Sequence, residues 1–224
     1  MLLTRSSQGK GRLIAVTTRE LHVISNGQSN LEHFAKIAAL IHPYVTAFHL
    51  REKLCSATEI WEGALAMNAG GVPLSKVIIN DRVDIAWATG ALGVQLGSHS
   101  LQVQVVRRDF PRMLIGRSVH DVDEAVAMCN EGADYLMYGH IFQTDSKPNQ
   151  VARGIRALEE VVKKVSIPVI AIGGIKPDHV HQIMTTGAAG IAVLSGITES
   201  HNPLKSVKDY REALDSKSIW ALKE

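Results

Sequence analysis

The sequence has few aromatic residues, few cysteines and little net charge. Phe, Trp and Tyr make up 5% of the 224 residues, and the formal net charge is +2 with the histidines neutral. A charge so close to zero creates no strong field, so we expect neither nucleic acid nor a membrane surface as a partner. The two cysteines, Cys55 and Cys129, lack metal-ligand spacing, which predicts buried free thiols in a reducing cytoplasm.

Long hydrophobic runs are also absent. No stretch is long enough to cross a bilayer, and residues 1–12 are basic and polar, without the apolar centre of a signal peptide. We therefore expect a cytoplasmic protein in which residues 1–12 form a flexible basic segment and residues 13–224 form the folded domain. Hydrophobic residues make up 46% of the chain, which is enough for one sizeable core.

Short apolar runs alternate with helical patterns along the chain. Strands are predicted over 13–16, 45–50, 76–79, 93–96, 113–116, 134–138, 168–172 and 190–194. Helices are predicted over 31–41, 58–67, 81–89, 101–108, 122–130, 155–165, 176–186 and 203–214. This alternation, with short connections, predicts a single-domain α/β fold, a closed (β/α)8 TIM barrel. A doubly wound open sheet would need a glycine-rich fingerprint after the first strand, and Val16-Thr17-Thr18-Arg19 supplies none.

Small residues follow the last two predicted strands. They are Gly173 and Gly174 after one strand, and Ser195 and Gly196 after the next. Backbone N–H groups can approach an anion closely where side chains are absent, and a helix N-terminus adds partial positive charge. The glycines could instead only turn each strand into a helix. Two such ends on neighbouring strands favour a phosphate-binding site, which we call the phosphate site.

Polar side chains follow the other predicted strands. In chain order they are Thr17, Thr18, His49, Arg51, Lys53, Asn80, Asp81, Ser98, His99, Ser118, His120 and His140. In a barrel these strand ends meet at one mouth, so the repetition predicts a substrate pocket rather than a structural or adaptor protein.

Several of these residues have a second interpretation. Arg51 and Lys53 could be solvated charges at a helix entrance, but an inward arginine closing a buried strand favours an anion as its partner. Asp81 could cap the following helix, and this role can coexist with one in the pocket. Ser118 could be only a small residue at a strand end.

His140 is the sharpest candidate for catalysis. It ends a buried strand and precedes the longest irregular connection, about 143–154, and such connections in compact barrels are often lids. A histidine there can accept and return a proton near neutral pH, although it could also be a hydrogen-bonded core residue. His99 and His120 are weaker candidates for the same role, and each could instead hold a neighbouring loop.

Five segments carry a resemblance to a known family. In order they are Leu50-Arg51-Glu52-Lys53, Ile79-Asn80-Asp81-Arg82-Val83-Asp84, Gly132-Ala133-Asp134-Tyr135, the segment 168–175 and the segment 190–196. Together they resemble the thiamine phosphate synthase superfamily over nearly the whole chain. The synthase branch joins a pyrimidine diphosphate to a thiazole phosphate and needs Mg²⁺ held by two aspartates. The resemblance puts one at Asp81 and the other at Ser100, which is no anionic ligand. Thr17-Thr18 also stands where the family usually has Thr-Asp.

The loop after the sixth predicted strand resembles a second branch. The synthase loop reads Gly-Pro-Ile/Val-Phe-x-Thr, whereas this chain has Gly139-His140-Ile-Phe-Gln-Thr144. This loop and Gly116-Arg117-Ser118-Val119-His120 are similar to the TenI branch, whose members are thiazole tautomerases with a histidine at that position. The resemblance therefore implies isomerisation of the carboxylated dihydrothiazole phosphate to the aromatic 2-(2-carboxy-4-methylthiazol-5-yl)ethyl phosphate in thiamine biosynthesis.

This reaction moves one proton, which requires a positioned acid/base and neither metal nor cofactor. We expect His140 to transfer the proton, Arg51 to grip the carboxylate or another part of the ligand, and the phosphate site to anchor the phosphorylated thiazole. The remaining candidates for substrate binding share a place at a strand end or in the expected lid: Lys53, Asn80, Ser118, His120 and, from the family, Lys147, with Arg153 beside it.

Three functions stay open at this point, and the tautomerase is favoured. The synthase is the second, and a non-catalytic regulator that binds phosphorylated thiazole or thiamine phosphate is the third. We also expect a homo-oligomer, a dimer or larger. Trp61, Trp87 and Trp220 are compatible with an interface or with packing inside one subunit.

Overall fold

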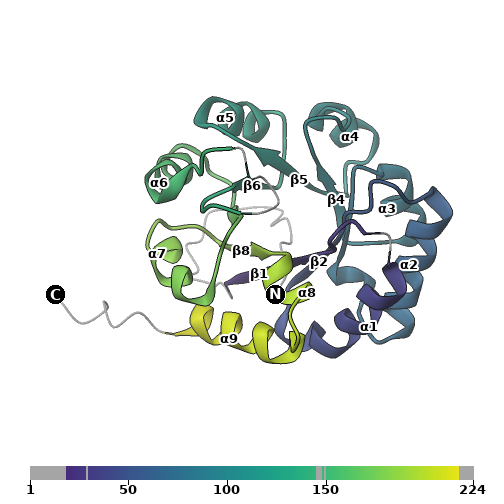
Figure 1. Cartoon of the computed structure of the whole chain (residues 1–224). Coiled ribbons are helices and arrows are strands. Elements are labelled where there is room, and N and C mark those ends of the chain that lie inside the picture. Colours follow the sequence, from purple (N-terminus) through teal and green to yellow (C-terminus); the bar gives the residue numbers. More distant parts are fainter. Residues whose placement is uncertain (1–18, 29, 145–147, 149, 217–224) are drawn as a thin grey trace, which may run out of the picture.

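The chain folds into a closed barrel of eight parallel strands, as predicted. The computed structural model describes residues 19–28, 30–144, 148 and 150–216. The strands pair in chain order, and β8 returns to β1 (Figure 1). They are β1 (Glu20–Ile24), β2 (Ala47–Leu50), β3 (Val77–Asn80), β4 (Gly93–Leu96), β5 (Leu114–Val119), β6 (Tyr135–Gly139), β7 (Val169–Ile172) and β8 (Gly190–Val193).

Helices surround the barrel in a ring (Figure 1). They are α1 (Leu31–Ile41), α2 (Ala57–Ala69), α3 (Val83–Thr89), α4 (Val103–Asp109), α5 (Val122–Asn130), α6 (Gly154–Lys164), α7 (Val180–Met184), α8 (Ser195–Thr198) and α9 (Pro203–Asp215). Short 3₁₀ turns occupy His42–Tyr44, Leu74–Lys76 and Pro177–His179. Side-chain caps fix several helix starts, since Asn30, Ser56, Asp121 and Asn202 each accept a backbone N–H of the first turn.

The first strand was predicted in the wrong place. The pattern predicted it over 13–16, which lies outside the described residues, whereas the strand that pairs with β2 and β8 is Glu20–Ile24. Glu20 and His22 made this stretch look polar. Because alternate side chains of a strand point to opposite faces, Leu21 and Val23 join the core outside the barrel while His22 is buried among residues of the interior.

Two apolar layers hold the fold together. The larger cluster fills the space between the strands and the helices and includes Phe48, Leu136 and Ile191. A smaller cluster fills the barrel interior and is formed by Ile24, Ala47, Ile78, Leu114, Tyr135, Met137, Ile170 and Ala192. Such a filled interior makes the barrel a rigid support for residues at the strand ends.

Three expectations about single residues can be compared with the structure. Cys55 and Cys129 are free, as predicted, but both are half-buried rather than buried. Trp61 and Trp87 are 41% and 70% exposed, and Trp220 lies outside the described residues. Oligomerisation remains a prediction. In the part of the chain that the structure describes, no helix has the length and apolar character needed to span a bilayer.

Candidate functional site

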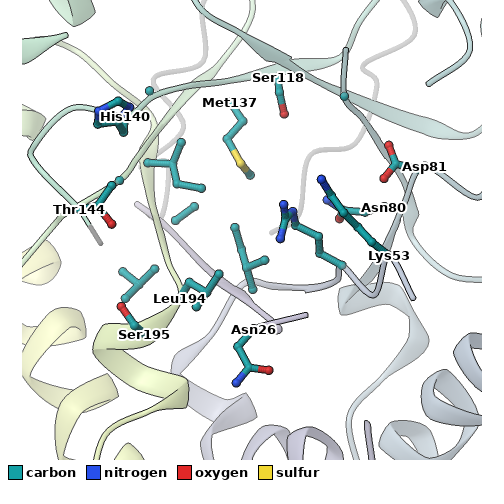
Figure 2. A pocket seen from close by; sticks show the side chains of 18 of the residues that line it. Asn26, Lys53, Asn80, Asp81, Ser118, Met137, His140, Thr144, Leu194 and Ser195 are labelled. Carbon is teal, nitrogen blue, oxygen red and sulfur yellow. The ribbon is translucent and has the colours of Figure 1, made fainter. Parts of the chain in front are cut away.

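A cavity of about 890 Å³ opens at the carboxyl ends of the strands. Nearly all the strand ends that the sequence singled out contribute to its wall, so the prediction of one shared mouth is confirmed. Figure 2 shows two separate groups of polar side chains across this cavity: Lys53, Asn80 and Asp81 on one side, and His140, Thr144 and Ser195 on the other. The site therefore has two polar ends.

The first end carries two cations and follows strands β2 and β3. Arg51 and Lys53 both line the cavity, and the Arg51 backbone N–H donates to Ser25 Oγ at 2.9 Å. Among the described residues, no carboxylate forms an ion pair with either side chain. Two cations that have no counterion among the described residues and line one cavity favour an anionic ligand. We call Arg51 and Lys53 the cationic end.

Asp81 lies next to the cationic end but does not cap a helix. Helix α3 starts at Val83, and its N-cap residue Arg82 makes no side-chain capping bond. Asp81 instead has a left-handed φ of 65°, and its Oδ1 accepts the Ser100 hydroxyl. Ser100 Oγ in turn accepts the Gly97 N–H at 2.7 Å. The capping role considered for Asp81 is therefore wrong.

The same two residues decide whether the synthase-type magnesium site fits this chain. A serine faces Asp81 where the resemblance requires a second carboxylate, and it uses Asp81 as a hydrogen-bond acceptor. The described residues contain no cluster of three or more His, Cys, Asp or Glu side chains suited to a metal ion. These side chains do not form the two-aspartate magnesium site, so no step below is routed through a metal.

The phosphate site forms the other end of the cavity. Gly173 and Gly174 have φ values of 101° and 64°, and Ser195 and Gly196 start helix α8. The glycines also have a packing role, because a Cβ at Gly173 would overlap His140 and a Cβ at Gly174 would overlap the carbonyls of Phe142 and Gln143. Helix α8 has no side-chain cap, so its first N–H groups remain available to a ligand.

His140 lies beside the phosphate site. Its side chain is 5% exposed and lines the cavity, and Nε2 is 3.2 Å from the Gln150 carbonyl oxygen. Because a carbonyl oxygen only accepts hydrogen bonds, Nε2 is the donor in this contact. Arg153 was expected in a lid, but its Nε donates to Gly139 O and its N–H donates to His140 O, so it holds the end of β6. Lys147 lies outside the described residues.

His120 is held by a carboxylate from helix α5. Glu124 Oε2 accepts the His120 backbone N–H at 2.8 Å and is 3.2 Å from Nδ1. Arg117 approaches the other oxygen of Glu124 at 4.0 Å. This contact favours a proton on Nδ1, which leaves Nε2 as the nitrogen able to accept one.

His49 was predicted at the mouth, but the structure buries it inside the barrel. It is fully buried, and its Nε2 is 2.9 Å from His22 Nδ1. Burial, followed by the nearby His22, holds the pKa of His49 well below 6.5. The prediction was wrong because the side chain lies one layer below the mouth.

Sequence reasoning missed several polar residues of the cavity wall, among them Asn26 and Thr144. Asn26 lies just after β1 and was missed because the first strand was misplaced. Thr144 lies in the loop after β6, where no periodic pattern identifies it. Thr17 and Thr18, which were proposed instead for the first strand end, lie outside the described residues.

These features define a class of protein: a (β/α)8 barrel whose mouth is a cavity lined by polar and cationic side chains. The sequence profile of a family described as "Thiamine monophosphate synthase" matches residues 14–197. The chain belongs to this family.

Individual relatives agree with the family. The thiamine-phosphate synthase of Chloroflexus aurantiacus is 38% identical over 205 residues, which cover 89% of this chain and 91% of the relative. That of Pyrococcus horikoshii is 32% identical over 197 residues, covering 88% and 95%. A solved structure of thiamine phosphate pyrophosphorylase from Pyrococcus furiosus has a TM-score of 0.76 and 31% identity, and covers 88% of this chain and 96% of that chain.

The comparisons correct the expected reaction. The thiazole tautomerase was favoured on the loop around His140, but relatives at 32–41% identity and the structural neighbour carry the synthase name or its pyrophosphorylase equivalent. The expectation of an isomerase, with proton transfer by His140 as its central step, was wrong. It gave two short loop motifs more weight than the similarity of the whole chain.

Proposed function

We propose that this chain is a transferase that joins a pyrimidine diphosphate to a thiazole phosphate, the activity named for its relatives. The observation that carries this proposal is one cavity that is lined both by the cationic end and by the phosphate site. A substrate pair in which each member carries its own phosphate matches such a cavity. A thiazole phosphate that carries no carboxylate would leave one end without an anion.

The cationic end fits the diphosphate. Arg51 and Lys53 present a planar guanidinium and a flexible ammonium without protein counterions among the described residues, so both are available to a group with several negative charges. This replaces the carboxylate as the expected partner of Arg51. Asn80 adds an amide to the same wall.

The phosphate site fits the thiazole phosphate. Gly173, Gly174 and the uncapped start of α8 offer backbone N–H groups at positions without bulky side chains. His140 and Thr144 lie on this side of the cavity (Figure 2), and we assign them to binding of the phosphorylated thiazole. Lys147 belongs to the same loop in sequence and remains a candidate.

The cavity adjoins the apolar interior of the barrel, which suits two aromatic rings. Ile24, Met137 and Ala192 line the cavity and belong to the cluster that fills the barrel interior, and Ile172 packs against that cluster. In the reaction, the bond from the pyrimidine-bearing carbon to the diphosphate oxygen breaks and a bond from that carbon to the thiazole forms. Diphosphate leaves with the electron pair. Fixed positive charge at Arg51 and Lys53 stabilises the charge that develops there.

The test is direct synthesis. The purified chain is incubated with the pyrimidine diphosphate and the thiazole phosphate, with either Mg²⁺ or EDTA, and thiamine phosphate and released diphosphate are measured. We expect product only when both substrates are present, at a rate above that of heat-inactivated protein. No product in either condition would refute the proposal. Binding of both substrates without turnover would instead identify the regulator considered from the sequence.

A further inference from the structure

A hydrogen-bonded chain inside the barrel ends at the pocket residue Ser118. The Tyr135 hydroxyl donates to Gln95 Oε1 at 2.6 Å, and Gln95 Nε2 donates to Ser118 Oγ at 3.0 Å. Tyr135 is fully buried and Gln95 is 1% exposed, whereas Ser118 lines the cavity. These two hydrogen bonds therefore connect the interior of the barrel to its mouth.

The direction of these hydrogen bonds is fixed at Tyr135. Burial raises the pKa of Tyr135, so its hydroxyl keeps its proton and must donate it. Among the described hydrogen bonds, Gln95 Oε1 is the only acceptor for that proton. A reversed amide would leave a buried hydroxyl without an acceptor, which is unfavourable. The Gln95 carbonyl thus faces Tyr135, and its NH₂ group faces Ser118.

The backbone makes room for this pair at Gly116. A Cβ on Gly116 would overlap both the Tyr135 hydroxyl and Gln95 Oε1, the two atoms of the hydrogen bond. Gly116 lies on β5 between the neighbouring strands β4 and β6, and its register partners are Gln95 and Tyr135 themselves. The contact therefore depends on a glycine at this position of β5.

We propose that Gln95 and Tyr135 are positioning residues that fix the Ser118 hydroxyl as a hydrogen-bond donor toward the pocket. Ser118 Oγ accepts from Gln95, so its single proton is not used in that bond. No hydrogen bond of the described residues takes it either. A ligand that presents an acceptor opposite Ser118, such as a phosphate oxygen or an unprotonated ring nitrogen, takes this proton, whereas a ligand N–H would leave it without an acceptor.

This proposal rests on the proposed function, which supplies the two substrates of the assay. A double-mutant cycle tests it in the transferase reaction. We compare the wild type, Tyr135→Phe, Ser118→Ala and the double variant by kcat/KM. Losing the Ser118 bond lowers kcat/KM by roughly 2- to 12-fold. Tyr135→Phe frees the amide to turn and lowers kcat/KM by part of this factor.

The double variant gives the decision. If Tyr135 acts through Ser118, Tyr135→Phe changes kcat/KM in the wild-type background and changes nothing further in the Ser118→Ala background. An equal loss in both backgrounds would show a merely structural role and overturn the proposal. Thermal unfolding of all four proteins confirms that they are folded under the assay conditions.

A neutron structure of the free wild-type protein tests the proposal independently of turnover. Deuterium on Ser118 Oγ directed away from Gln95, with two deuterium atoms on the Gln95 nitrogen facing Ser118, supports the assignment. Deuterium between Ser118 and a Gln95 oxygen overturns it. An inactive wild type would refute the proposed function, and the neutron structure would still decide whether Gln95 and Tyr135 orient the Ser118 hydroxyl.

Discussion

Removing the positive charge of Arg51 is the sharpest test of how the pocket divides its two substrates. In Arg51→Met the aliphatic stem is kept and the guanidinium is lost. Because no described carboxylate pairs with this guanidinium, its removal leaves no buried partner charge. We expect the free energy of unfolding to change by no more than about 0.5 kcal/mol.

The expected loss of binding is much larger. A hydrogen bond to a charged group contributes about 1.5–3 kcal/mol, which corresponds to a factor of roughly 10 to 150 in affinity. This loss falls on the diphosphate substrate, because Arg51 follows β2 whereas the phosphate site follows β7 and β8. The KM for the thiazole phosphate should change by less than about threefold, within the spread expected for a site with which it makes no contact.

Initial rates measured with each substrate varied in turn provide the assay. Arg156→Met is the matched control, because Arg156 is exposed on helix α6 and does not line the cavity. Arg51→Met should raise the KM for the pyrimidine diphosphate, and Arg156→Met should raise neither KM. A loss confined to the thiazole phosphate, or shared equally by both substrates, would refute this assignment of the two ends.

Three further predictions concern stability and metal dependence. The pKa of buried His49 lies well below 6.5, so only the unfolded chain gains this proton as the pH falls below 6.5. The free energy of unfolding therefore falls there by up to about 1.4 kcal/mol per pH unit. Urea titrations should show a shallower dependence of this free energy on pH for His49→Gln than for the wild type. Gly174→Ala should lower the free energy of unfolding by about 2–4 kcal/mol. Gly90→Ala is the control and should lower it by about 1 kcal/mol, because Gly90 also has a positive φ but a Cβ there would meet open space. Equal losses in chemical denaturation would contradict the packing role of Gly174. Ser100→Asp places a second carboxylate beside Asp81 and should tighten Mg²⁺ binding in calorimetry, whereas Ser100→Ala should not. Similar titrations for both variants would contradict the conclusion that Ser100 prevents a two-aspartate magnesium site.

The fold could be predicted because buried parallel strands are continuous apolar runs. Ile78 and Ile79 on β3 and Ile170 on β7 are buried on one face or the other, so the sequence pattern alone marks their strands. β1 escaped this rule because Glu20 and His22 alternate with its apolar residues. The partner of His22 inside the barrel, His49, comes from a different strand and cannot be recognised from local sequence.

The site could be predicted as a set of strand ends but not as a set of contacts. The barrel topology brings Arg51, Ser118 and His140 to one mouth whatever contacts their side chains make, because all three follow or end strands at the same face. The hydrogen bond from the Ser100 hydroxyl to Asp81 involves a residue with a left-handed backbone conformation, which no spacing rule reveals. The reaction could not be predicted from His140, because a histidine in a pocket is compatible with binding as well as with proton transfer.

The pairing of the first and last strands has a consequence for how the protein is made. β1 hydrogen-bonds to β8, and Arg19 Nη1 donates to the carbonyl of Leu214, a residue 195 positions later. On a ribosome, β1 and β7 therefore remain open edges until β8 has emerged. Such edges are templates for pairing with other chains. A pause in synthesis before β8 has emerged should thus favour aggregation.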